Sequence, residues 1–165
     1  MYTKETLKHF TSPKNYGKLE NPDGVGKVGN IVCGDVMWLY IKLGKNKKQE
    51  EIIKDIKFET FGCVAAIATS SQVTELAKGK TLAEALNISK DDIIKSLGGL
   101  PPVKIHCSVL AIDALAEAVY DYLIKNKKLI SGDLVKRHDV IQKHKDVIED
   151  KYHDWTEAEE EIHDK

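Results

Sequence analysis

The chain changes its hydrophobic period once, at Gly62, and this change constrains the fold more than any other feature of the sequence. Before Gly62, β-branched and aromatic residues gather in segments 36–43 and 55–61, which is typical of strands. After it, the spacing of apolar residues predicts helices over 63–78, 81–86, 89–97 and 107–125. Strands followed by helices indicate an α+β fold, a three-stranded antiparallel sheet packed against several helices.

The first part of the chain is harder to assign. Thr3 to Phe10 reads as a short helix that Thr3 caps and that ends before Pro13. The Gly, Asn and Pro residues that follow predict a loop through Gly29, so the first strand is expected at Ile31–Val32. A hairpin turn is expected at 44–46.

The formal net charge of −1 hides two oppositely charged regions. Residues 149–165 contain eight acidic residues and two lysines, a net charge of −6, so residues 1–148 carry +5. All three cysteines and all four prolines precede residue 128. We therefore predict a domain at 1–127 and a charged, helical C-terminal extension at 128–165.

Composition also excludes several classes of protein. The near-neutral charge argues against general nucleic-acid binding, which needs a basic excess. No apolar run approaches the roughly 20 residues that span a bilayer, so we expect no membrane partner. The first residues lack the apolar core of a signal peptide, which favours a cytoplasmic protein.

The three cysteines all occupy junctions between predicted elements. Cys33 lies in a Cys-Gly-Asp turn before a strand, Cys63 lies where strand becomes helix, and Cys107 begins the last long helix. A helix N-terminus favours the thiolate, which is the metal-binding form of cysteine. Asp35 and His106 are close in sequence and supply further donor atoms. Three thiolates with one such residue complete a four-coordinate site for zinc or an iron–sulfur cluster.

Two other interpretations of the cysteines exist. Each could be a small buried hydrophobic residue, but this does not explain why all three cysteines lie at junctions between predicted elements. Disulfides are disfavoured by the odd number of cysteines and by the absence of a signal peptide.

The sequences around the cysteines are more specific than their spacing. Three segments closely resemble the cysteine motifs of the IscU/NifU-type iron–sulfur assembly scaffolds: GNIVCGDVM (29–37), FETFGCVAAIA (58–68) and LPPVKIHCS (100–108). The resemblance runs from about residue 3 to 126 with order and spacing kept.

The resemblance implies a scaffold, not an enzyme with turnover. Such a scaffold assembles a labile [2Fe–2S] cluster, or a [4Fe–4S] cluster, and transfers it to apo-proteins. Cys33, Cys63 and Cys107 match the cluster ligands, Asp35 matches an aspartate that keeps the cluster labile, and His106 matches an alternative ligand. Zinc is expected as a substitute in purified protein.

The resemblance also implies partners. Sulfur comes from a cysteine desulfurase as a persulfide, which Cys107 or Cys63 accepts, and a ferredoxin or another donor supplies electrons. A DnaK-type chaperone with its co-chaperone is expected to bind the segment Leu100, Pro101, Pro102, Val103 and Lys104. A homo-oligomer is compatible with this role.

Two alternatives come from other functional classes. The first is a zinc-dependent sulfurtransferase that accepts persulfide, and the second is a structural zinc module. Relatives of the first kind have a longer spacing between the second and third cysteines and usually lack the histidine, so this sequence favours the scaffold. One departure is Val64, where the scaffold family often has glycine.

The extension carries one apolar stripe with a period of about seven residues: Leu134, Ile141, Ile148, Trp155 and Ile162. Such a helix either packs on its own domain or frays in water; alternatively it docks on a partner or a second copy. The four histidines of the extension (138, 144, 153 and 163) invite a metal-storage hypothesis, which their wide spacing makes weak.

Overall fold

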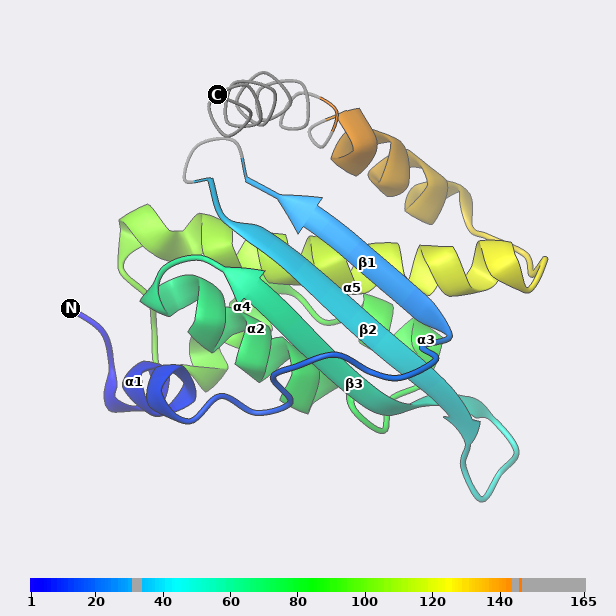
Figure 1. Ribbon diagram of the computed structural model, residues 1–165, viewed down its shortest axis with the longest axis horizontal. Helices are drawn as coiled ribbons and strands as arrows, with labels where there is room; N and C mark the ends of the chain where they lie inside the picture. Colours follow the sequence, from blue (N-terminus) through cyan, green and yellow to red (C-terminus); the bar gives the residue numbers. More distant parts are fainter. Residues whose placement is uncertain (31–33, 144–145, 147–165) are drawn as a thin grey trace, which may run out of the picture.

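A computed structural model describes residues 1–30, 34–143 and 146. Figure 1 shows one sheet with the helices behind it. The elements are α1 (Lys4–Thr11), β1 (Gly24–Gly29), β2 (Val36–Lys45), β3 (Glu51–Phe61), α2 (Val64–Ala77), α3 (Leu82–Leu86), α4 (Lys90–Ser96), the 3-10 turn η1 (Pro102–Lys104) and α5 (Ile105–Lys125). A further helical stretch covers 132–143. The predicted α+β class with three antiparallel strands is confirmed.

The sheet has the order β1-β2-β3 and one buried face. Side chains of a strand alternate between the two faces, and in β2 the buried set is Met37, Leu39 and Ile41, each fully shielded from solvent. This set joins Val73 of α2 and Leu115 of α5 in the main core. The sheet and helices therefore bury a single apolar layer between them.

The prediction of a loop through Gly29 is wrong, because residues 24–29 form β1. Glycines in this strand allow it to approach α5 closely, since a Cβ on Gly26 would lie 2.1 Å from the carbonyl oxygen of Ala114. The Val25 amide also donates to Asp121 of α5 at 2.9 Å. These glycines are packing residues of an edge strand. The predicted strand at Ile31–Val32 lies outside the described residues.

Two other boundaries differ from the prediction. β3 begins at Glu51, and the hairpin turn lies beyond Lys45, where the Asn46 side chain accepts from the amides of Lys48 (2.9 Å) and Glu50 (3.0 Å). α5 begins two residues before Cys107, because η1 leads directly into it.

The helix starts follow their predicted caps. The Thr3 hydroxyl accepts from the Thr6 amide at 3.1 Å and begins α1. Ser89 and Asp92 form a capping box at the start of α4. Among the described residues, no helix combines the length and apolar character needed to cross a lipid bilayer.

The helix at 132–143 packs against α5. Leu134 and Ile141 of the predicted apolar stripe are buried in the main core. Arg137 pairs with Asp113 at 3.0 Å, and the Nδ1 atom of His138 lies 2.9 Å from Glu117. Packing on its own domain therefore holds for this part of the extension. Ile148, Trp155, Ile162 and three of its histidines lie outside the described residues.

Candidate metal-binding site

Donor atoms from three elements meet at the end of the sheet where β2 begins and β3 ends. Asp35 directly precedes β2, Cys63 is the N-cap of α2, and Cys107 lies in the first turn of α5. The sulfur atoms of Cys63 and Cys107 are 3.9 Å apart. Each of them also lies 3.9 Å from Oδ2 of Asp35. His106 adds its Nε2 atom at 3.6 Å from the Cys107 sulfur.

These distances match those between ligands of one tetrahedral metal ion. With Zn–S bonds of about 2.3 Å, two thiolates on one tetrahedral ion are ~3.8 Å apart, and a sulfur and a nitrogen ligand are ~3.6 Å apart. The observed values are 3.9 Å and 3.6 Å. A disulfide needs a sulfur–sulfur distance of about 2.05 Å, so the two sulfurs are not bonded to each other. The arrangement fits a metal ion without large side-chain movement.

The site has a buried side and an open side. Asp35 and Cys107 are 6% and 1% exposed, whereas Cys63 and His106 are half-buried. Behind Cys107 lie Ala65 and Ala66 of α2, with which it forms a small apolar cluster. An apolar wall excludes water from one side of the site and strengthens electrostatic interactions there. Among the described donors, Cys63 and His106 are therefore the ones that reach solvent.

Gly62 makes room for Asp35. A Cβ atom on Gly62 would lie 2.7 Å from Cβ of Ala66 and 2.9 Å from Cγ of Asp35, both closer than real contacts allow. In the sequence, Gly62 marks the change from strand to helix and belongs to the motif at 58–68. One signal in the sequence pointed to its role. Gly62 directly precedes Cys63, in a segment where no turn requires a glycine.

Hydrogen bonds fix the backbone around the donors. The Gly34 amide donates to the carbonyl of Asn30 at 2.8 Å, and the Asn30 amide donates to the carbonyl of Asp35 at 2.9 Å. Gly34 has a φ of 71°, which favours glycine. The Thr69 hydroxyl, on α2, contacts the Cys107 carbonyl at 3.2 Å. Asn30 and Gly34 belong to the motif at 29–37, whereas Thr69 lies outside the three motifs.

The segment predicted to bind a chaperone flanks the same site. Leu100 packs against the alanine–cysteine cluster, and Val103 is 75% exposed on η1. Nearby negative groups, with Cys63 the strongest, raise the pKa of Lys104. Lys104 therefore remains a cation beside the thiol groups.

The structure brings together Asp35, Cys63, His106 and Cys107, which are four of the five predicted ligands. The fifth, Cys33, lies outside the described residues. Within the described part of the chain, Asp35, His106 and Cys107 place their donor atoms within 4.8 Å of one another, close enough to hold one ion.

Comparisons with known proteins show the family to which the chain belongs. The family profile of the NifU-like N terminal domain matches residues 1–129. The iron–sulfur cluster assembly scaffold protein IscU 1 of Archaeoglobus fulgidus is 57% identical over 129 residues, which cover 78% of this chain and 81% of the relative. The IscU scaffold of Aquifex aeolicus is 46% identical over 128 residues, covering 78% of this chain and 80% of the relative.

A solved structure has the same fold. The crystal structure of the N-terminal part of a nitrogen-fixing NifU-like protein from Brucella abortus superimposes with a TM-score of 0.59 and 21% sequence identity. The match covers 74% of this chain and 94% of that structure.

Proposed function

The chain belongs to the NifU-like N terminal domain family of iron–sulfur cluster assembly scaffolds, and from that premise we propose how its site works. A [2Fe–2S] cluster is assembled as cargo on Cys33, Cys63 and Cys107, with Asp35 or His106 as the remaining ligand. The cluster is then handed to an apo-protein. The protein itself is a scaffold and not an enzyme.

The observation that carries the proposal is the triangle of Asp35, Cys63 and Cys107. Its three sides are each 3.9 Å, and two of its corners are thiols, the ligands that iron–sulfur clusters use. A carboxylate is a harder ligand than a thiolate and a poorer partner for cluster iron. Asp35 therefore favours a cluster that forms and then leaves.

Sulfur delivery fits the same geometry. A thiolate on Cys63 or Cys107 attacks the terminal sulfur of a desulfurase persulfide, which forms a new S–S bond as the donor cysteine leaves as a thiolate. Because the two sulfur atoms are only 3.9 Å apart, a sulfur delivered to either cysteine lies beside the other. Lys104 adds a positive charge that suits an incoming persulfide anion.

The remaining partners are proposed on similar grounds. A chaperone that captures Leu100 to Lys104 would hold a segment ending two residues before His106, so its binding can shift the start of α5 and loosen the cluster. An electron donor and apo-protein recipients complete the cycle. We place this chemistry in the cytoplasm, because thiolate ligands need a reducing compartment.

Anaerobic reconstitution tests the proposal directly. The full chain is incubated with ferrous iron, cysteine and a cysteine desulfurase, and thiolate-to-iron absorption is followed together with bound iron and sulfide. A coloured species that transfers its cluster to an apo-ferredoxin supports the scaffold. Zinc binding with faster desulfurase turnover and no cluster would establish the zinc-dependent sulfurtransferase instead.

A further inference from the structure

The face of the sheet that points away from the helices is open except where the segment between α1 and β1 crosses it (Figure 1), with the Asn21 carbonyl accepting from Lys42 at 2.8 Å. Trp38 and Tyr40 of β2 alternate with the buried core residues and are half-buried on this opposite face. No helix within the described ranges covers it (Figure 1). Phe61, at the end of β3, is 72% exposed, and its ring contacts Trp38 edge-on with the centroids 6.1 Å apart. Phe61, the exposed member of this aromatic pair, lies two residues before Cys63 in the sequence.

The open face also carries positive charge. Lys27 of β1 and Lys57 of β3 share it with Trp38 and flank the aromatic pair, since the register aligns Lys27 with Trp38 and Lys57 with Tyr40. Of the nearby acids, Asp55 pairs with Lys78, and Glu59, which accepts from the Tyr40 hydroxyl at 2.8 Å, contributes one negative charge to this face. In the part of the chain that the structure describes, neither Lys27 nor Lys57 forms an ion pair.

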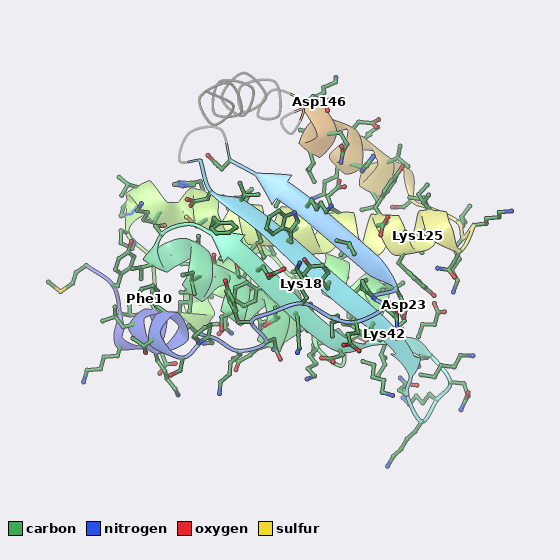
Figure 2. All side chains as sticks on the ribbon, viewed as in Figure 1. Phe10, Lys18, Asp23, Lys42, Lys125 and Asp146 are labelled. Carbon is green, nitrogen blue, oxygen red and sulfur yellow. The ribbon has the colours of Figure 1, made fainter. Side chains whose placement is uncertain are left out.

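The C-terminal helix lies beside the edge strand β1 (Figure 1). His138 and Gln142 line a cavity of about 440 Å³ together with Val25 and Lys27 of the edge strand β1. Asp146, labelled in Figure 2, is the last residue that the structure describes. The remaining residues can span about 3.3 Å each when extended, whereas β1 and β3 are only ~10 Å apart.

We propose that residues 149–165 dock in cis on the open face of the sheet. Their net charge of −6 complements Lys27 and Lys57, and Trp155 supplies an apolar ring for the exposed pair of Trp38 and Phe61. A tethered segment has an effective concentration in the millimolar range, so even weak contacts hold it in place.

Zero-length cross-linking of the full chain tests the proposal. A carbodiimide joins a lysine amine to a carboxylate only where they touch, and mass spectrometry identifies the pair. We expect Lys27 and Lys57 to join acids of 149–161, with this yield falling several-fold in about 1 M salt, where the Debye length is about 3 Å. Mixing ¹⁴N-labelled and ¹⁵N-labelled protein separates links within one chain from links between chains.

A matched pair of lysines provides the control. Lys47 and Lys48 are exposed in the β2–β3 turn, at the opposite end of the sheet. Equal cross-linking to Lys47 and Lys48 would show that the attraction is non-specific. Links found only between differently labelled chains would show that a second copy binds the face. The absence of links from Lys27 and Lys57 would show that the segment does not bind there and that the face is free for a partner protein. Each of these three results overturns the proposal.

Fluorescence gives an independent measurement, since Trp38 and Trp155 are the only two tryptophans. The Trp38→Phe variant isolates the emission of Trp155. We expect this emission to shift to longer wavelength when Lys27→Gln and Lys57→Gln are added, and to stay unchanged with Lys47→Gln and Lys48→Gln. An emission maximum that does not change with Lys27→Gln and Lys57→Gln would also overturn the docking.

Discussion

The metal-binding site and the contact between α5 and the C-terminal helix are both built from polar side chains, but their spacing differs. In the helix contact, Glu117 accepts from His138 at 2.9 Å and from Gln142 at 3.2 Å, and the His138 ring stacks on Tyr120. At the site, the corresponding separations are 3.6 to 3.9 Å, at the outer limit for hydrogen bonds to sulfur. The first contact consists of ordinary hydrogen bonds, whereas the second has the wider spacing of groups that could hold one metal ion.

This difference assigns separate roles to the two regions. Short hydrogen bonds to a buried carboxylate stabilise the folded chain, because leaving that group without a partner is costly. Under the proposed function, the donors at the site serve cluster binding and not the stability of the fold. Substitutions in the two regions should therefore separate cluster assembly from stability.

Removing a central donor should have the largest effect. In Cys107→Ala the buried thiol is lost, and we expect anaerobic reconstitution to yield less than about a tenth of the wild-type cluster, since sulfur ligands dominate such sites. Absorption and bound iron give the yield. Val109→Ala, on the exposed side of the same helix turn, is the control and should assemble normally. A normal yield from Cys107→Ala would remove this cysteine from the site.

Filling the space beside Asp35 should affect both properties. The new methyl group of Gly62→Ala would overlap Ala66 and Asp35, so we expect the free energy of unfolding to fall by about 2–3 kcal/mol and the cluster yield to drop. Urea denaturation and reconstitution measure the two effects. The control is Gly132→Ala, whose Cβ meets nothing within 4 Å. Unchanged assembly would show that Asp35 needs no such room.

Breaking the helix contact should change stability alone. His138→Ala leaves Glu117 without one donor and removes the stacked ring, so we expect a loss of about 1–2 kcal/mol in the free energy of unfolding. Cluster yield at 25 °C should stay normal. The exposed Lys136→Ala on the same helix should change neither quantity. A defect in assembly would show that the two regions are coupled.

Replacing the carboxylate at the site should change lifetime more than yield. Because Asp35 is a poor ligand for cluster iron, we expect the cluster of Asp35→Ala to survive a chelator several-fold longer than that of the wild type. The decay of its visible absorption gives the rate. Asp139→Ala, exposed on the C-terminal helix, serves as the reference. A shorter lifetime in Asp35→Ala would contradict the role given to this residue.

The smallest effect is expected at another contact whose polar groups are already hydrogen-bonded, the one between Glu51 and the end of α5. Hydrogen bonds from Lys128 and then Tyr122 lower the pKa of Glu51 below its usual 4.5. This contact therefore stabilises the fold above the unfolded-state pKa and is lost as pH falls through the lower, folded-state value. Glu51→Gln should flatten the fall in stability below pH 4.5, and the exposed Glu50→Gln should not. Identical acid profiles for wild type and Glu51→Gln would refute this.

Local signals explain what could be predicted from the sequence. The caps at Thr3 and Ser89 act within three residues, so their helices were found. The motifs around Cys63 and Cys107 identified both the family and the residues that the structure brings together. The class of the sheet followed from strand-forming residues in β2 and β3.

Contacts between distant residues explain what could not be predicted. Gly26 looks like a loop residue until α5, almost ninety positions later, packs against it. The space that Gly62 leaves for Asp35 likewise depends on a strand that precedes it by many residues. The pairing of His138 with Glu117 depends on how the extension folds back, which a spacing of histidines does not encode.

The separation of the donors along the chain has a consequence during protein synthesis. Asp35 and Cys63 are 28 positions apart, and Cys63 and Cys107 are 44 apart. No fragment that lacks α5 holds both close thiols, so a chain still emerging from the ribosome cannot capture iron and sulfide in the completed geometry. The geometry of the site is therefore complete only once the chain has been made through α5 and has folded.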